Sequence, residues 1–344
     1  MQLNKHDRDE RETRIAAFLE AAGWDGAERT PLAGDASFRR YERLSGDEGR
    51  AVLMDAPPPE DVRPFRRVAE MLTRMGFSAP KILARDETGG LLLLEDFGDC
   101  TFARALRDGA AAHELYGLAV DALVALNDIW DPQHGVAAGL PAYDDALLVG
   151  REAALFLDWY LPAVGVKVDA AGRAAYAAAW RKALAAAHSL PTTLVLRDYF
   201  PENLMLLEDR SGVACCGLLD FQDAVVGSCA YDLASLLQDA RRPVAPEVEE
   251  TMIARFLEAY PALDEQAFRA GYTVLAAQRH AKVIGIFTRL AQRDGKPDYL
   301  KHIPHVWSLM ERALPHPALE PVKMWFDRWA PAELRRRPKE ETST

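Results

Sequence analysis

Three oxygen-bearing side chains lie close together in the second half of this 344-residue chain. Asp198 and Asn203 stand five residues apart in a polar, turn-rich loop between two short apolar runs, and Asp220 follows a third apolar run. Loops held by strands are where functional residues concentrate. Carboxylate and amide oxygens are ligands that Mg²⁺ accepts together with substrate phosphates, so the pattern indicates phosphoryl transfer. The same residue types also form Asx turns and helix caps, and spacing alone supports both interpretations equally.

The two apolar runs beside these residues predict a β-hairpin. Turn-forming residues separate the apolar runs 204–207 and 213–219. If residues 207 and 213 pair across this turn, Asn203 faces Gly217 in the ladder. Asp220 then extends three residues, about 10 Å, beyond that ladder. Both oxygen ligands are therefore expected at the open end of one hairpin, next to the loop that carries the first carboxylate.

The elements that must position this loop fall into two regions. Periodicity and turn signals before residue 97 predict a strand-rich region with two helices. Its helices are expected at residues 9–23 and 65–75, and its strands at residues 29–32, 38–44, 51–54, 79–83 and 91–94.

After residue 98 the character of the sequence changes. Alanine-rich helical stretches dominate at residues 102–129, 145–190 and 270–293, and only the strands around Asp198 interrupt them. We therefore expect two lobes, an N-terminal one over residues 1–97 and a helical C-terminal one over residues 98–344.

The composition excludes several classes of protein. Lys and Arg number 41 against 52 Asp and Glu, and the net charge of −11 repels nucleic acid and anionic membranes. Residues 1–14 lack the apolar core of a signal peptide, and no run approaches the ~18 apolar residues of a membrane span. The four cysteines have no CxxC spacing. We expect a cytoplasmic monomer with reduced cysteines and with no nucleic-acid or membrane partner.

The loop resembles the catalytic loop of the protein-kinase-like fold. Leu196-Arg197-Asp198 stands at the His-Arg-Asp of that fold, Asn203 at its metal-binding Asn, and Leu219-Asp220-Phe221 at its Asp-Phe motif. Residues 33–239 follow the order of the aminoglycoside phosphotransferase and choline kinase branch, which phosphorylates small molecules. The resemblance implies an α+β, bilobal protein-kinase-like fold with a small β-rich N-lobe and a larger helical C-lobe.

The resemblance also implies roles for these residues. Asp198 would orient an acceptor hydroxyl and take its proton as it attacks the γ-phosphorus of ATP, while Asn203 and Asp220 would hold Mg²⁺. Within the branch, residues 54–58, 217–224 and 231–241 look like the bacterial N-acetylmuramate/N-acetylglucosamine anomeric kinases of cell-wall recycling. The expected acceptor is therefore the C1 hydroxyl of an N-acetyl amino sugar.

The glycine-rich loop that covers the phosphates in the wider fold is thin in this chain. Residues 33–37 contain a single glycine. Backbone N–H groups and one hydroxyl must then meet the nucleotide, and we expect them to come from Gly34, Asp35 and Ser37.

A charged pair that positions the phosphates in the wider fold is also missing. Met54 stands where a phosphate-pairing Lys is expected, and Phe65 lies near the position of its Glu partner. The two losses are consistent because removing one charge alone would leave the other unpaired. Another cation must take over, and our hypothesis is Arg40, or Arg39 beside it. The alternative is an ordinary solvated arginine on a strand.

Candidates for adenine and sugar binding follow from the same resemblance. Adenine is expected against the backbone at Glu95 and Phe97, with Met54 as an apolar wall. The sugar candidates are polar or aromatic residues near the catalytic loop and in the helical segment 151–161, although such residues also pack in cores: Tyr199, Glu202, Asp223, Glu152 and Asp158. N-acetylmuramate is anionic and would also need a local cation, such as Arg241, Arg279 or Lys282.

Two alternatives remain open at this point. The acceptor could be an aminoglycoside or a choline-like alcohol, because an acidic chain suits a cationic substrate. The chain could also be a catalytically silent, nucleotide-binding module, because it lacks the strand Lys and has a thin glycine loop. Against the silent module stands the complete set Asp198, Asn203 and Asp220.

Overall fold

The computed structural model describes residues 5–32 and 39–339, and the chain divides into two compact units. The first unit comprises Met1–Ala105 and Leu204–Asp223, and the second comprises Leu106–Asn203 and Ala224–Thr344. This division differs from the predicted boundary at residue 97, since a segment from the middle of the chain joins the first unit.

The first unit is built on a five-stranded antiparallel sheet with the strand order β1-β2-β3-β5-β4. Two helices accompany it, α1 (Lys5–Ala21) and α2 (Arg63–Arg74). The strands are β1 (Glu28–Pro31), β2 (Arg40–Gly46), β3 (Gly49–Asp55), β4 (Ile82–Asp86) and β5 (Leu91–Glu95). All five predicted strands and both helices are present, with ends shifted by a few residues.

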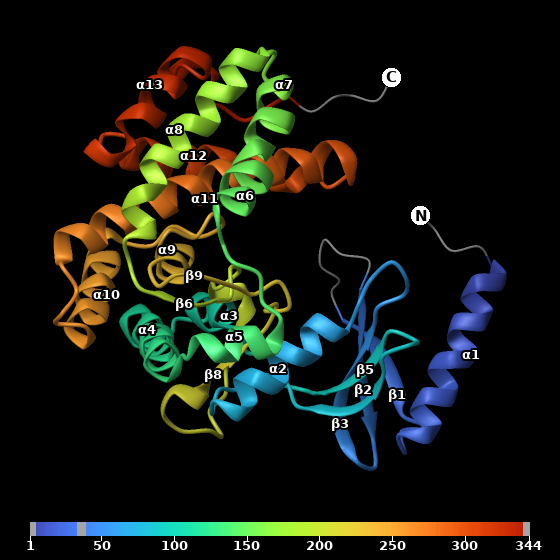
Figure 1. The fold of residues 1–344 in the computed structure, drawn as a ribbon. Helices are drawn as coiled ribbons and strands as arrows, with labels where there is room; N and C mark the ends of the chain where they lie inside the picture. The colour runs from blue at the N-terminus through green and yellow to red at the C-terminus, as the bar shows by residue number, and fades with distance from the viewer. Residues whose placement is uncertain (1–4, 33–38, 340–344) are drawn as a thin grey trace. The chain divides into compact units, whose positions relative to one another are not determined.

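Both faces of this sheet are covered. Ile15 and Leu19 of α1 pack in one cluster with Leu91 and Leu93, which point to the same face of β5 because side chains alternate along a strand. Leu92 and Leu94, which point to the opposite face of β5, are also buried. Figure 1 shows α1 and α2 on opposite sides of the sheet. The uninterrupted apolar run of β5 is explained by this two-sided burial.

The hairpin of β7 (Leu204–Leu206) and β8 (Cys216–Leu218) belongs to the first unit because backbone hydrogen bonds tie it there. The N–H of Leu206 donates to the carbonyl of Cys100 at 2.8 Å, and that of Leu218 donates to the carbonyl of Ser78 at 2.7 Å. The Ser78 hydroxyl donates to the carbonyl of Ala214 at 2.6 Å. Alternation within the sequence could not show these bonds, because they join residues more than a hundred positions apart.

The predicted register of the hairpin is wrong by two residues. Leu204 pairs with Leu218 and Met205 with Gly217, whereas the prediction placed Asn203 opposite Gly217. The cause is a 3₁₀ turn over Gly212–Cys215, which takes residues that the prediction assigned to the second strand. A shift of two keeps every side chain on its predicted face.

The second unit is mainly helical and contains one two-stranded antiparallel sheet. In that sheet β6 (Thr192–Val195) pairs with β9 (Val225–Ser228), a strand that the sequence analysis did not predict. The α-helices from the unit boundary onward are α3 (Phe102–Arg107), α4 (Ala112–Ile129), α5 (Pro132–Ala138), α6 (Asp145–Leu147), α7 (Leu161–Ala163), α8 (Ala170–His188), α9 (Tyr231–Leu237), α10 (Pro246–Ala259), α11 (Glu265–Arg293), α12 (Ile303–Ala313) and α13 (Glu320–Trp329). Two π-helical segments, Leu148–Ala153 and Phe156–Tyr160, and short 3₁₀ helices at Pro201–Asn203, Pro297–His302, Pro317–Leu319 and Ala332–Leu334 complete it.

The long helix α11 is the centre of the second unit. It packs against α8, α9 and α12, and most of its side chains are buried (Figure 1). At Gly285 a Cβ atom would lie 2.4 Å from the backbone carbon of Leu155, so only glycine permits this approach of α11 to the π-helical region. Charged side chains that α11 carries into the interior are therefore held in fixed positions.

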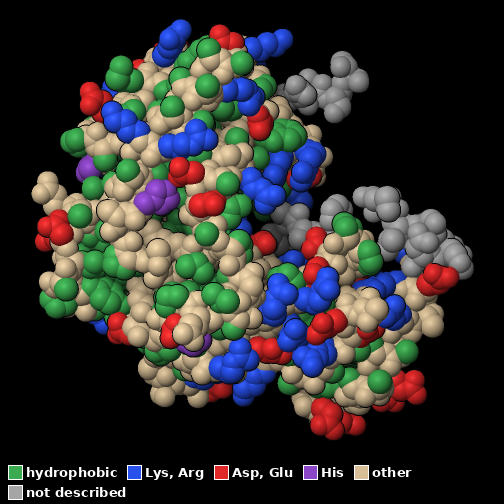
Figure 2. Space-filling view, in the orientation of Figure 1, with side chains coloured by type: hydrophobic (Ala, Val, Ile, Leu, Met, Phe, Trp, Pro, Cys, Tyr) green, Lys and Arg blue, Asp and Glu red, His purple; other side chains and the backbone are tan. Residues whose placement is uncertain are grey.

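Surface features agree with the composition. Basic and acidic side chains are interspersed on the face drawn in Figure 2. Among the described residues no helix is both long and apolar enough to cross a membrane. The four cysteines form no disulfide.

Candidate active site

Backbone strain marks both segments that the sequence analysis selected. Arg197 has φ +71° and Asp220 has φ +57°, and these are the only non-glycine residues with positive φ in the described part of the chain. Such conformations each cost about 1–3 kcal/mol and cluster at functional sites, where the surrounding structure must hold them. The first precedes Asp198, and the second is itself a predicted metal ligand.

A buried carboxylate holds the first strained segment. Asp232 of α9 is 3% exposed, and its two oxygens accept the N–H groups of Leu196 at 2.6 Å and Arg197 at 2.9 Å. Burial raises the pKa of Asp232 to about 7, although the two backbone donors oppose that rise. These two contacts therefore brace the backbone of the loop.

A second group of contacts holds the Arg197 side chain. Its guanidinium donates to Oε1 of Glu152 at 2.6 Å, and Lys282 of α11 lies 2.9 Å from the same oxygen. The other oxygen accepts the Tyr143 hydroxyl at 2.6 Å and the Gln278 amide at 3.3 Å. Burial alone would raise the pKa of Glu152, but the two cations outweigh it and lower the pKa to about 2.

These contacts correct two predictions made from the sequence. Glu152 was predicted to bind the sugar, but both of its oxygens are occupied and it is buried, so it supports the catalytic loop instead. Lys282 was a candidate for an anionic substrate, but Glu152 already neutralises it.

Tyr199 is also buried inside the unit. Its side chain is 2% exposed, and its hydroxyl donates to the carbonyl of Ala119 in α4 at 2.8 Å. This bond anchors the loop to α4 and leaves the side chain unsuited to the predicted sugar contact. Asp158 is exposed and pairs with Arg173 at 2.8 Å, the geometry of an ordinary surface ion pair.

Asn203 closes the loop behind Asp198. Its side-chain amide donates to the carbonyl of Asp198 at 2.9 Å, and its backbone N–H donates to the carbonyl of Phe200 at the same distance. Glu202 lies in the same 3₁₀ turn, and its Oε2 is buried without a hydrogen-bond partner. Glu202 and Asn203 therefore lie in one short turn of the second unit, and Asn203 ties that turn to the backbone of Asp198.

The segment around Asp220 is supported within the first unit. The Gln222 amide donates to Oδ1 of Asp220 at 2.6 Å. The neighbouring Phe221 is fully buried and stacks on Phe65 of α2, with ring centroids 4.9 Å apart. The helix position that lacks the expected Glu thus supplies an aromatic ring that supports this segment. Asp223 is exposed at the end of the segment.

The predicted nucleotide residues lie in the first unit, except that Gly34, Asp35 and Ser37 fall outside the described residues. Met54 is fully buried in β3, opposite Leu92 of β5. Arg40 is about half exposed, and its guanidinium contacts Oδ2 of Asp55 at 2.5 Å.

The connector after β5 is fastened to the hairpin through Arg210. The guanidinium of Arg210 contacts Oε1 of Glu95 at 2.5 Å and lies 4.9 Å from the centroid of the Phe97 ring. These contacts occupy the side chains and leave the prediction of adenine recognition by the connector backbone unchanged.

The donor atoms suit Mg²⁺ better than a transition metal. Asn203 and Asp220 offer hard amide and carboxylate oxygens, and Mg²⁺ binds a few such oxygens together with substrate phosphates. No cluster of three or more His, Cys, Asp or Glu side chains that could hold a metal occurs among residues 5–32 and 39–339. The donor chemistry of each of these two side chains therefore fits an ion that is completed by the phosphates of a nucleotide.

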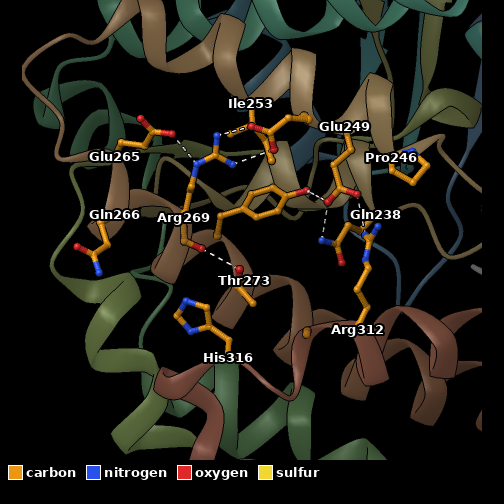
Figure 3. Close-up of a pocket in the computed structure, with 13 residues that line it drawn as sticks. Gln238, Pro246, Glu249, Ile253, Glu265, Gln266, Arg269, Thr273, Arg312 and His316 are labelled. Atoms are coloured by element: carbon orange, nitrogen blue, oxygen red, sulfur yellow. Dashed lines mark hydrogen bonds and ion pairs between the residues drawn. The ribbon is translucent and has the colours of Figure 1, made fainter.

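A cavity of about 750 Å³ lies among α10, α11 and α12 of the second unit, and none of the predicted site residues lines it. Figure 3 shows its polar side chains paired with one another. Glu249 accepts from Tyr272 at 2.9 Å and from Arg312 at 2.7 Å, and Arg269 pairs with Glu250. Because these groups already have partners within the protein, the cavity lacks the features of a reactive centre.

Comparisons with known proteins agree with this geometry. Residues 28–266 match the phosphotransferase enzyme family. The chain is 40% identical to an N-acetylmuramate/N-acetylglucosamine kinase of Caulobacter vibrioides, over 95% of this chain and 99% of the relative. It is 41% identical to a kinase of the same name from Pseudomonas aeruginosa, over 86% of this chain and 87% of the relative.

Solved structures share the fold. The ternary complex of APH(2")-IIa with streptomycin and ATP superposes with a TM-score of 0.55 at 15% identity, over 83% of this chain and 91% of that one. The predicted α+β, kinase-like architecture, with a strand-rich first part and a helical second part, is confirmed by such likenesses.

We predict that Glu152→Gln lowers the free energy of unfolding by about 3–5 kcal/mol, because it leaves two buried cations without their carboxylate. The pKa of Glu152 is depressed in the folded state, so its stabilising contribution is present above about pH 4.5 and is lost as the pH falls toward 2. Urea unfolding at pH 7 and pH 3 measures both effects. Asp158→Asn is the control and is expected to change stability by less than ~1 kcal/mol. Equal losses in the two variants would contradict the prediction.

We further predict that Phe65→Ala lowers kcat about 10- to 100-fold with little change in the KM of the acceptor. The substitution removes the ring that supports Phe221 and therefore displaces Asp220, and small displacements of reacting groups reduce rates by such factors. Steady-state kinetics measure the change, and a thermal melt confirms that the variant is folded. Phe65→Leu retains apolar contact and should lose much less. A folded Phe65→Ala variant with normal kcat would show that the stack has no role in positioning.

Proposed function

The chain belongs to the phosphotransferase enzyme family, and on that basis we propose that it phosphorylates N-acetylmuramate and N-acetylglucosamine with ATP as the donor. The observation that carries the proposal is 40% identity over 95% of the chain to a kinase of these sugars. The braced loop of Asp198 supports it, because the phosphotransferase resemblance assigns the reaction to this loop. The anomeric C1 hydroxyl is the proposed acceptor, and recycling of cell-wall sugars is the proposed setting.

Asp198 is the proposed catalytic residue. Its carboxylate would accept a hydrogen bond from the sugar hydroxyl, orient the oxygen toward the γ-phosphorus of ATP, and take the proton as the O–P bond forms and the bond to ADP breaks. The rigid turn beneath it supplies position, since Asn203 bonds the carbonyl of Asp198 and Asp232 holds the two preceding N–H groups. Most of the rate enhancement in such reactions comes from positioning and charge stabilisation.

Asn203 and Asp220 are proposed to hold Mg²⁺, which would neutralise negative charge on the phosphates when bound. Gln222 orients the Asp220 carboxylate by its 2.6 Å hydrogen bond. Asp223 and Glu202 remain candidates for contacts with the acceptor, and of these Glu202 has the buried oxygen without a partner.

On the nucleotide side, Gly34, Asp35 and Ser37 are proposed to meet the phosphates, with Arg40 as the cation that takes the place of the absent strand Lys. Arg40 is half exposed beside Asp55, which supports a guanidinium held in one orientation at the end of β2. Adenine would lie against the connector of Glu95 and Phe97. Met54 is fully buried in β3.

The test is release of ADP by the purified protein with ATP and Mg²⁺. We expect turnover of N-acetylmuramate and N-acetylglucosamine, a fall of about 10²- to 10⁴-fold in kcat for Asp198→Asn, and a product whose phosphorus NMR signal places the phosphate on C1. Asp158→Asn, in an exposed ion pair, is the control and should keep its rate.

Other outcomes separate the alternatives. Turnover of an aminoglycoside or choline alone would contradict the proposed acceptor while retaining the reaction class. Binding of ATP without turnover of any of the four acceptors would favour a silent nucleotide-binding module.

A further inference from the structure

Two arginines of the second unit lie against the catalytic loop without an ion-pair partner. The guanidinium carbon of Arg241 is 4.6 Å from the centroid of the Phe200 ring, and that of Arg279 is 5.8 Å from the same centroid. Phe200 follows Asp198 by two residues, a span of about 7 Å at most. Among the described residues no carboxylate oxygen lies within 4.0 Å of either guanidinium.

Arg279 is the less usual of the two. It belongs to α11 and is 2% exposed, and its Nη1 is buried without a hydrogen-bond partner. Taking a cationic group out of water is strongly unfavourable unless a partner compensates it. Asp232 and Asp239 interact electrostatically with Arg279, but no described carboxylate lies within 4.0 Å of its guanidinium, so a ligand that brings an anionic group would supply the missing hydrogen-bond partner.

Lys282, on the same helix, differs from Arg279 because it has an ion-pair partner. Lys282 lies three residues further along α11 and is also buried, but Glu152 accepts it at 2.9 Å. The same helix thus carries one cation in direct contact with a carboxylate and one without such a contact. Arg241, after α9, is held by ring faces on two sides, since Phe287 lies 5.5 Å from it as well as Phe200.

Carboxylates also lie near the two arginines. Asp239 is fully buried, its Oδ1 accepts the N–H of Arg241 at 2.9 Å, and its Oδ2 has no hydrogen-bond partner. Burial and the nearby carboxylate of Glu202 raise the pKa of Asp239 to about 6, while the backbone N–H of Arg241 and the charges of Arg241 and Arg279 oppose the rise. Arg242 is a third arginine in this region. Tyr116 interacts electrostatically with Arg242 and with the carboxylates of Asp239 and Glu202.

The neighbouring histidines add little charge at neutral pH. Burial lowers the pKa of His280 and of His302, and the nearby arginines act in the same direction. His305 contacts the backbone carbonyl of Asp239 at 3.0 Å. The three arginines therefore share this region with the carboxylates of Asp232, Asp239 and Glu202, and none of these carboxylates contacts the guanidinium of Arg279 or Arg241.

We propose that Arg279 and Arg241 bind the lactyl carboxylate of N-acetylmuramate and so set the preference between this sugar and N-acetylglucosamine, which has no carboxylate. The inference rests on the proposed function, because it assigns a subsite to the same acceptor. Guanidinium groups bind carboxylates through paired, charge-assisted hydrogen bonds. The lactyl group branches from C3 of the sugar, so a C1 hydroxyl at Asp198 and a carboxylate beside Phe200 are compatible with one bound molecule.

The test combines a change in the substrate with a change in the protein. The wild-type protein is assayed with N-acetylmuramate, with its methyl ester at the lactyl carboxylate, and with N-acetylglucosamine. We expect the ester to raise KM about 10- to 100-fold relative to N-acetylmuramate, with little change in kcat. Arg279→Gln should raise KM for N-acetylmuramate by a similar factor, abolish its advantage over the ester, and leave N-acetylglucosamine within about threefold of the wild type.

Matched variants separate recognition from structure. Arg269→Gln removes an arginine of the same helix that is already paired with Glu250 and Glu265, and it should change none of the three KM values. Arg279→Lys keeps the charge without the paired donors and should give an intermediate KM for N-acetylmuramate. If Arg279→Gln fails to fold, the wild-type comparison of acid and ester decides the question, together with Arg241→Gln.

Two results would overturn the inference while leaving the proposed function intact: equal KM values for acid and ester in the wild type, or a proportional loss on all three substrates in a folded Arg279→Gln variant. Absence of wild-type turnover on both natural sugars would instead overturn the proposed function, and the subsite with it.

Discussion

The reactive loop depends on one interaction, the acceptance of two successive backbone N–H groups by the buried carboxylate of Asp232. Arg197, which directly precedes Asp198, has a left-handed backbone conformation. Without these hydrogen bonds the chain would relax out of that conformation. The Asp232 oxygens fix the backbone, and Glu152 fixes the Arg197 side chain from the other direction. These buried groups prevent the loop from relaxing, and in the proposed mechanism they direct the Asp198 carboxylate as the base.

The first unit solves a related problem without charges. The wider fold uses a Lys–Glu pair, whereas this chain places Met54 and Phe65 at those positions and buries both. Phe65 stacks on Phe221, the residue that follows Asp220. This apolar contact supports the strained backbone of Asp220. An aromatic stack transmits the position of a helix to a neighbouring segment as an ion pair would, and it avoids the desolvation of two charges.

The sequence predicts much of this because local patterns carry it. Alternation located all five strands of the first sheet, and turn signals placed Asp198 and Asn203 in a loop between two strands. Burial could not be predicted in the same way. Glu152 and Tyr199 have the residue types of sugar ligands, yet partners far away in the sequence enclose them. The strand β9 is four residues long and is recognisable only through its pairing with β6. The hairpin joins the first unit through bonds to residues 78 and 100, which no local pattern encodes.

The central claim is that Asp232 acts only by positioning Asp198, and a double-mutant cycle on kcat tests it most directly. Asp232→Asn is measured in the wild-type background and in Asp198→Asn, with N-acetylglucosamine as the acceptor and with thermal melts to confirm folding. The account predicts a large loss of kcat in the first background and almost none in the second, because a positioning residue has nothing left to position. Equal losses in both backgrounds would contradict it and would show that Asp232 contributes independently of the catalytic carboxylate.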